Sequence, residues 1–170
     1  MQTIYLAGGC FWGLQKYLDQ FSGIKATEVG YANGPEGFRG SGADGAPTYQ
    51  DVCANSGHAE TVKVEFDEAQ ITLEALLERY FTVIDPVSVN RQGHDSGVQY
   101  RTGIFYTSPQ QLPAIEAVCA GQRQLAGREL AVLVEPLKNY FPAEEYHQKY
   151  LDKNPGGYCH IPASRLHMVP

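Results

Sequence analysis

The sequence contains no Cys-x-x-Cys pair and no apolar run as long as a membrane span. The first absence argues against a zinc ribbon and a thioredoxin-type redox motif. The second argues against a transmembrane helix. The amino terminus, MQTIYLAGG, also lacks the basic start and the long apolar core of a secretory signal peptide. We therefore expect a cytoplasmic protein.

An excess of positive charge is absent as well. The net charge is −6, which argues against binding to nucleic acid or to an anionic membrane surface. The length of 170 residues, with 43% hydrophobic and 19% charged residues, is typical of one globular domain that buries a sizeable core. We expect a single domain over residues 1–170, in which residues 160–170 form a tail that could begin a linker.

Cysteine is scarce, whereas glycine and tyrosine are abundant. The four cysteines could form two disulfides in three ways, but a chain of this size needs no cross-links and a cytosolic setting keeps thiols reduced. Eighteen glycines, ten prolines and eleven tyrosines predict ordered loops with aromatic pockets. The segments 33–56 and 85–99 are the two long loops, and loops of that length in a compact domain are usually functional or mobile.

Hydrophobic periodicity predicts alternating strands and helices. Strands are expected at 3–7, 24–32, 61–66, 102–107 and 130–134, and helices at 14–21, 73–84, 108–126 and 143–151. The order begins β-α-β-β-α-β, which predicts an α+β fold: a ferredoxin-like split βαβ two-layer sandwich. Its sheet would be mixed and mostly antiparallel, with helices on one face and long ordered loops.

The segment Gly8-Gly9-Cys10-Phe11-Trp12-Gly13 places a thiol where the first strand gives way to a helix. A helix N-terminus favours negative charge, so we expect a lowered pKa and a nucleophilic thiolate at Cys10. Phe11 and Trp12 would form an apolar wall beside it. The alternative is that Cys10 is a buried cysteine that fills a strand–helix corner, with Phe11 and Trp12 as core.

Further polar and aromatic motifs follow at loop-to-strand junctions and near the end of the chain. They are GHAE at 57–60, RQGHDSGVQYR at 91–101, AEEYHQKYL at 143–151 and KNPGGYC at 153–159. Together with GCFWG, and in this order, these motifs resemble the A-type peptide methionine sulfoxide reductases. The resemblance runs from Ile4 to about Ile161.

The resemblance implies reduction of methionine-S-sulfoxide, free or in proteins, to methionine. Cys10 would attack the sulfoxide sulfur and become a sulfenic acid, while Phe11 and Trp12 would hold the S-methyl group. Four further residues would act on the sulfoxide oxygen or order the site: Glu60 as general acid if burial raises its pKa, Tyr49 and Tyr100 as hydrogen-bond donors, and Asp95 as an ordering carboxylate. Without the resemblance, Glu60 is a strand end and Asp95 a turn residue.

The resemblance also assigns the redox partner steps. Cys159 would form a disulfide with Cys10, and thioredoxin would reduce it. No cofactor or metal is implied, and we expect a monomer. Because no cysteine follows Cys159, the relay has one step, and Cys53 and Cys119 are expected to be packed thiols. The glycine-rich segment 33–46 is longer than usual for the family, and the tail is similar to that of A-type modules fused to a B-type reductase.

Three interpretations from other classes remain. A metal site would pair Cys53 and His58 with Cys159 and His160, although the spacing does not suit a compact zinc knuckle. A Cys-His-Asp hydrolase would use Cys10 with His94 and Asp95 and would need an oxyanion site. A non-catalytic module would bind peptides on its aromatic surface.

Overall fold

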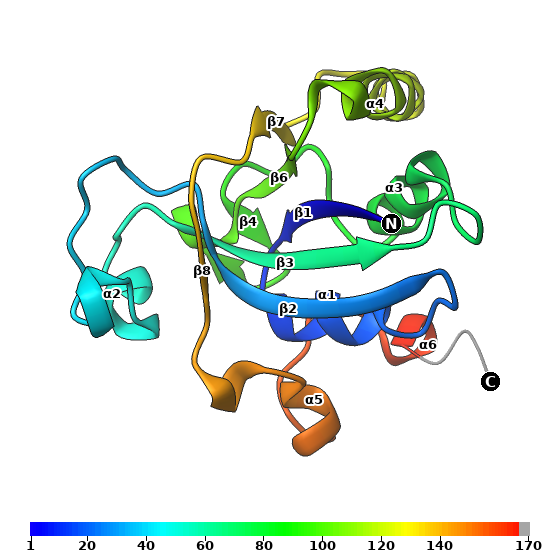
Figure 1. Ribbon diagram of the computed structural model, residues 1–170. Helices are drawn as coiled ribbons and strands as arrows, with labels where there is room; N and C mark the ends of the chain where they lie inside the picture. The colour runs from blue at the N-terminus through cyan, green and yellow to red at the C-terminus, as the bar shows by residue number, and fades with distance from the viewer. Residues whose placement is uncertain (167–170) are drawn as a thin grey trace.

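Six strands form one sheet in the computed structural model, which describes residues 1–166 (Figure 1). The strand order is β7-β6-β1-β3-β2-β8. All neighbours are antiparallel except β6 and β7, so the predicted mixed, mostly antiparallel sheet is confirmed. The strands are β1 (Gln2–Gly8), β2 (Ile24–Ala32), β3 (Ala59–Phe66), β6 (Thr102–Tyr106), β7 (Leu133–Pro136) and β8 (Tyr140–Pro142).

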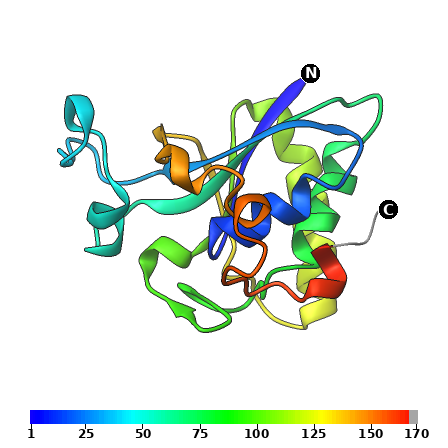
Figure 2. The ribbon, with the colours of Figure 1, turned by 90° about the horizontal axis from the view of Figure 1, so that it is seen from below.

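The main core lies between one face of this sheet and three helices, α1 (Phe11–Leu18), α3 (Leu73–Phe81) and α4 (Leu112–Ala126). Successive side chains of a strand point to opposite faces, so the paired residues Ile4 with Val64 and Leu6 with Val62 share this face. Figure 2 shows α1 and the α3–α4 pair on the same side of the strands. The helices bury their apolar stripes here, in agreement with the periodicity of the sequence.

The ends of the helices follow from local side chains. Thr72 caps α3, because its hydroxyl accepts the N–H of Ala75 at 3.1 Å. Ser108 and Pro109 start a 3-10 turn that leads into α4, and Gly127 ends α4 with φ +68°. These boundaries agree with the predicted helices 73–84 and 108–126 at their starts.

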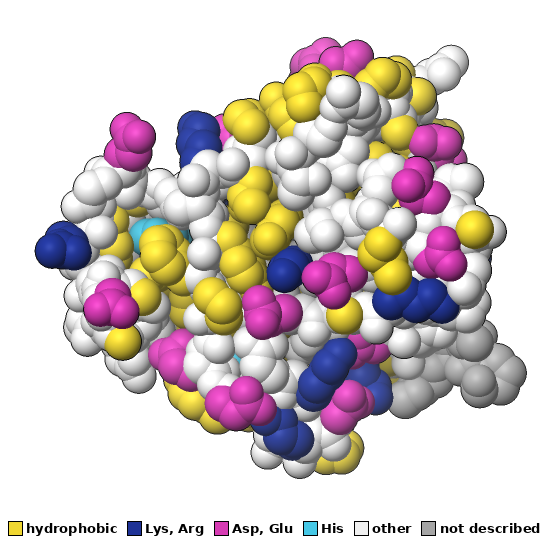
Figure 3. All heavy atoms as spheres, in the orientation of Figure 1, with side chains coloured by type: hydrophobic (Ala, Val, Ile, Leu, Met, Phe, Trp, Pro, Cys, Tyr) yellow, Lys and Arg dark blue, Asp and Glu magenta, His cyan; other side chains and the backbone are white. Residues whose placement is uncertain are grey.

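The opposite face of the sheet carries a smaller apolar cluster. Tyr5 and Phe105 are buried there, and the rings of Tyr5 and Tyr140 meet at 4.9 Å. Residues 133–142, which include β7 and β8, cross this side of the molecule (Figure 1). Figure 3 shows hydrophobic side chains gathered near the middle of this view.

The two long loops contain structure that the sequence pattern did not indicate. A helix, α2 (Tyr49–Cys53), lies in segment 33–56, and a capping box of Thr48 and Asp51 starts it. A two-stranded hairpin, β4 (Arg91–Gln92) with β5 (Asp95–Ser96), lies in segment 85–99. Elements this short are fixed by side-chain caps and tertiary contacts, and they leave no periodic signal.

The carboxyl-terminal third also differs from the prediction. The strand predicted at 130–134 is observed a few residues later, as β7 (Leu133–Pro136). Strand β8 was not predicted. The predicted helix 143–151 is a 3-10 turn (Glu145–His147) followed by α5 (Tyr150–Lys153), and α6 (Ala163–Leu166) was not predicted. The predicted tail 160–170 is described only to residue 166, and residues 167–170 lie outside the described range. Among the described residues, no helix has the length and apolarity to cross a membrane.

Candidate active site

Cys10 lies at the junction between β1 and α1, as the N-cap residue of the helix. Gly9 forms the turn with φ +84°, and a Cβ on it would lie 2.6 Å from the Cβ of Gln92. Only glycine permits both this conformation and the close approach of the 85–99 loop. The thiol is consequently buried, with 6% of the residue exposed.

The charge state of Cys10 differs from the prediction. Burial raises the pKa of the thiol well above its usual range, and Glu60 raises it further. The backbone N–H of Trp12, in the first turn of α1, hydrogen-bonds the sulfur and opposes this rise without cancelling it. The expected lowering of the pKa is therefore wrong, because desolvation outweighs the helix terminus. Cys10 rests as a neutral thiol.

Glu60 lies on β3, and the fold places its carboxyl group against the start of α1. Its Oε1 accepts the backbone N–H of Phe11 at 3.2 Å, next to Cys10 in the chain. Only 2% of Glu60 is exposed, and burial raises the pKa of its carboxyl to about 8, although the Phe11 hydrogen bond opposes the rise. The carboxyl group is therefore mostly protonated at neutral pH, which is the condition that a general acid must meet.

Tyr49 and Tyr100 reach the same region from separate loops. Tyr49 starts α2, and Tyr100 ends the 3-10 turn Val98–Tyr100. Burial raises the pKa of both phenols, and the charge of Glu60 raises both further, so the two side chains lie within electrostatic reach of that carboxyl. Both remain protonated hydrogen-bond donors at any physiological pH.

Phe11 and Trp12 form an aromatic wall at the start of α1. Trp12 stacks on Tyr150 with 3.8 Å between ring centroids and 13° between planes. Its indole Nε1 donates to Nδ1 of His147 at 3.0 Å. Phe11 is buried against Tyr31 and His147, at 5.8 and 5.3 Å. The wall is held by stacking and one hydrogen bond, so its shape is fixed.

Asp95 lies on β5 and contacts the tail of the chain. Its Oδ2 accepts the hydroxyl of Tyr158 at 3.1 Å, and its charge contributes to the raised pKa of Cys10 and Glu60. The residue thus lies near the thiol and ties the hairpin to the segment that carries Cys159. A turn-forming role alone does not account for this contact.

Cys159 is half-buried on the tail, and its sulfur lies against α1. A Cβ built on Gly13 would be 2.6 Å from that sulfur. All four cysteines are free thiols. Cys119 is buried in α4, as expected, whereas Cys53 is exposed at the end of α2, so its assignment as a packed thiol is wrong.

The fold thus brings the predicted site residues together from six separate stretches of chain. Contacts or electrostatic coupling connect each of them to Cys10, to Glu60 or to the start of α1: Phe11, Trp12, Tyr49, Tyr100, Asp95 and Cys159.

Two residues of the site were missed by sequence reasoning. His147 is fully buried and accepts the Trp12 indole, so its own proton is on Nε2, which has no hydrogen-bond partner among the described residues. Glu144 accepts the Tyr31 hydroxyl at 2.8 Å and the backbone N–H of Tyr49 at 2.9 Å. Both lie in the 143–151 motif. A carboxylate and an imidazole among the aromatic residues of that motif could have indicated that they belong to the site.

The other classes of site find no support in the geometry. Among residues 1–166, no group of three or more His, Cys, Asp or Glu side chains could hold a metal ion. His94 is exposed at the turn of the hairpin, whereas Cys10 is buried, and no hydrogen bond joins them in the described structure. The arrangement therefore lacks the nucleophile–base pair that a hydrolase needs.

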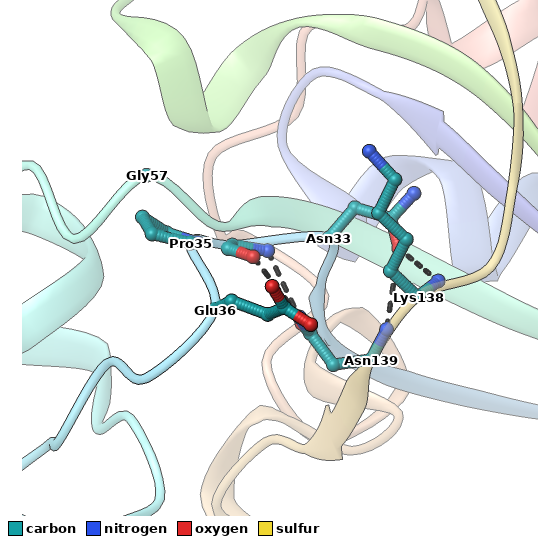
Figure 4. A pocket seen from close by; sticks show the side chains of 7 residues that line it. Asn33, Pro35, Glu36, Gly57, Lys138 and Asn139 are labelled. Atoms are coloured by element: carbon teal, nitrogen blue, oxygen red, sulfur yellow. Dashed lines mark hydrogen bonds between the residues drawn. The ribbon is translucent and has the colours of Figure 1, made fainter.

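A separate pocket of about 520 Å³ lies beside the start of the glycine-rich segment (Figure 4). Two asparagines join its walls: Asn139 exchanges two hydrogen bonds with the backbone of Gly34, and Asn33 accepts the N–H of Lys138 at 2.7 Å. Asn33 has a left-handed backbone conformation, with φ 53°. These bonds anchor the segment to the connection between β7 and β8.

Comparison with known proteins gives one consistent result. A family model described as "Peptide methionine sulfoxide reductase" matches residues 2–168. The peptide methionine sulfoxide reductase MsrA of Clostridium acetobutylicum is 48% identical over 167 residues, 98% of each chain. The crystal structure of Mxr1 from Saccharomyces cerevisiae in reduced form is similar, with TM-score 0.88, 37% identity and coverage of 95% and 91%. Mxr1 in complex with Trx2 has the same fold, with TM-score 0.59, 24% identity and coverage of 88% and 84%.

Proposed function

The chain belongs to the peptide methionine sulfoxide reductase family, and we propose that its described site reduces methionine-S-sulfoxide by a two-cysteine relay. As a member of this family it is a thiol-dependent oxidoreductase that converts methionine sulfoxide to methionine. The residue roles below are the proposal. The observation that carries them is the buried, protonated Glu60, hydrogen-bonded to the N–H of Phe11 directly after Cys10.

The aromatic wall binds the substrate by its methyl group. Phe11 and Trp12 contact the S-methyl carbon, and the oxygen points toward Glu60, Tyr49 and Tyr100. An apolar wall on one side and three donors on the other suit a sulfoxide, which is apolar at one end and polar at the other. Only one epimer presents the methyl group and the oxygen to both sides while the sulfur faces Cys10.

The first chemical step transfers oxygen from the substrate to Cys10. Glu60 gives its proton to the sulfoxide oxygen, and the thiol proton of Cys10 restores Glu60. The Cys10 sulfur attacks the sulfur of the protonated sulfoxide and forms a transient S–S bond. The hydroxyl then passes from the substrate sulfur to the Cys10 sulfur as the substrate S–O bond and the transient S–S bond break, so methionine leaves and Cys10 becomes a sulfenic acid. Because the thiol and the acid are both neutral beforehand, no charge is left uncompensated in the buried site.

The second step restores the thiol. The Cys159 thiol attacks the Cys10 sulfur, the S–OH bond breaks, and water leaves as the disulfide forms. Thioredoxin then reduces the disulfide by thiol exchange. The complex of the relative Mxr1 with Trx2 supports thioredoxin as the reductant. The four free cysteines suit the reducing cytoplasm, which we propose as the location.

One experiment tests this function. The protein is incubated with a racemic methionine sulfoxide and dithiothreitol, and the remaining sulfoxide is resolved by epimer. We expect complete loss of the S epimer at sulfur and retention of the other. Absence of turnover, or consumption of both epimers, would contradict the proposed site.

A further inference from the structure

We propose that Gly13 is a positioning residue for disulfide formation, because the Cys159 sulfur occupies the space that a side chain at position 13 would fill. This space is called the seat of the sulfur below. This inference rests on the proposed function, since it assigns a residue to the second step of that reaction. Methionine release precedes the step and does not need the seat.

The seat is defined by contacts to the position that a Cβ would occupy. A Cβ on Gly13 would lie 2.6 Å from the Cys159 sulfur and 3.3 Å from Cδ1 of Ile161. A carbon cannot approach a sulfur so closely, so any side chain at this position displaces the thiol. Gly13 is in the first turn of α1, and glycine is a weaker helix former than alanine, by up to about 1 kcal/mol in a helix interior. Local helix stability therefore does not explain the glycine.

The seat lies on the same side of the helix as the nucleophile. Cys10 is the N-cap of α1 and Gly13 is its third residue, the two positions whose groups meet in a capping box, so they are neighbours across the first turn. Because the Cys159 sulfur lies where the Gly13 side chain would be, it waits within about one helical turn of Cys10. The electrostatic influence of Cys159 on Cys10 agrees with this placement.

Restraints on both sides of Cys159 hold the sulfur in the seat. Tyr158 donates to Asp95 at 3.1 Å, and the backbone N–H of Ile161 donates to the Cys159 sulfur at 3.4 Å. Ile161 is itself buried, with 4% exposed. The tail crosses α1 in Figure 2, and contacts of α5 and α6 with α1 keep it there. The thiol is thus positioned before the sulfenic acid exists.

The chemistry makes this position matter. The Cys159 sulfur forms the S–S bond as the S–O bond of the Cys10 sulfenic acid breaks, and the thiol proton leaves with the hydroxyl as water. Attack requires the two sulfur atoms to be in line at near-contact distance, and a misplacement of about 1 Å can slow a reaction about 100-fold. A methyl group at position 13 imposes a displacement of this order.

The test compares Gly13→Ala with wild type in a single turnover without reductant. Released methionine reports the first step. Sulfenic acid trapped by dimedone, and the peptide that contains both cysteines, report the second. We expect Gly13→Ala to release one methionine at close to the wild-type rate but to form the disulfide about 10- to 100-fold more slowly, with trapped sulfenic acid. Gly121→Ala is the matched control, because a Cβ there meets no atom within 4 Å in helix α4.

Thermal unfolding separates positioning from damage to the fold. In the Cys159→Ala variant the sulfur is absent, so adding Gly13→Ala should raise the Tm, because alanine is a better helix former than glycine. In the protein that retains Cys159, Gly13→Ala should raise the Tm less, or lower it. Disulfide formation by Gly13→Ala at the wild-type rate would overturn the inference. A wild type that releases no methionine or forms no Cys10–Cys159 disulfide would instead overturn the proposed function.

Discussion

The carboxyl group of Glu60 accepts the backbone N–H of Phe11 at 3.2 Å, and this bond joins the start of β3 to the first residue of α1. It places a buried carboxyl group beside Cys10, which is the one residue between the Gly8-Gly9 turn and the helix. The proposed acid and the proposed nucleophile are therefore held on one junction of strand and helix, as the coupling of proton transfer with attack requires.

Replacement of the acid gives the first prediction. Glu60→Gln retains a hydrogen-bonding amide but cannot transfer a proton, so methionine release should slow by roughly 10²- to 10⁴-fold. In the wild type, the same step should weaken as the pH rises through about 8, because the carboxyl loses its proton there. Single-turnover rates between pH 6 and 10 measure both. A loss smaller than tenfold in Glu60→Gln would assign the proton to the tyrosines or to water.

The same carboxyl makes a prediction about stability. Its folded pKa of about 8 lies above the value of about 4.3 in an unfolded chain, so the folded state holds the proton more tightly. Stability from this group is full below the unfolded pKa and is lost as the pH rises toward 8. The free energy of unfolding of Glu60→Gln minus that of wild type should therefore increase by about 1.4 kcal/mol for each unit that the pH rises between pH 5 and 8. Urea titrations at three pH values would show it, and a constant difference would contradict the raised pKa.

Loss of the nucleophile gives the third prediction. Cys10→Ser should release no methionine, because a serine hydroxyl is a far weaker nucleophile than a thiol that can ionise. Cys119→Ala serves as the control, since Cys119 is a free thiol in helix α4 and has no assigned role in the reaction. Chromatography of methionine after one turnover is sufficient. Residual release above a few per cent would remove Cys10 from the role.

Cys159→Ser separates the two redox steps. With excess sulfoxide and no reductant, it should release about one methionine per enzyme and stop with a sulfenic acid on Cys10. Wild type should also release about one, but lose two free thiols to a disulfide. Thioredoxin should restart the wild type and rescue the variant poorly, because it attacks a disulfide. Normal cycling of Cys159→Ser with thioredoxin would move the resolving role to another thiol, and Cys53 is the next to test.

Tyr158→Phe removes the hydroxyl that Asp95 accepts. One hydrogen bond of this kind contributes about 0.5–1.5 kcal/mol, so disulfide formation should slow by about 2- to 13-fold while methionine release is unchanged. Rapid acid quenching followed by thiol counting gives the rate. An effect on methionine release equal to that on disulfide formation would show that Asp95 and Tyr158 order the whole site rather than the tail.

The parts of the fold with a regular pattern were predictable. Leu76, Leu77 and Tyr80 repeat at helical spacing, and Val62 and Val64 alternate along a strand, so the elements that bury them could be located. The hairpin that carries Asp95 has two residues in each strand and no such pattern. Its position depends on contacts with the tail, more than sixty residues away.

The sequence motifs indicated residues that the fold brings close together, but they did not indicate the electrostatics of the candidate site. Motifs indicated Cys10, Glu60 and Cys159, yet the sign of the shift at Cys10 depends on how deeply the finished fold buries it. A helix terminus is visible in a local sequence, whereas desolvation is the sum of distant segments. The contact of Trp12 with His147 joins residues 135 positions apart, which no local pattern indicates.

Trp12 is the single tryptophan of the chain, and it lies two residues after Cys10, stacked on Tyr150 and bonded to His147. All indole fluorescence of the protein therefore comes from the aromatic wall beside Cys10, which is the proposed substrate site. Occupancy by a methyl group and passage from thiol to sulfenic acid to disulfide each change the surroundings of that indole. The enzyme thus carries its own optical reporter, and stopped-flow emission can follow each step without an added label.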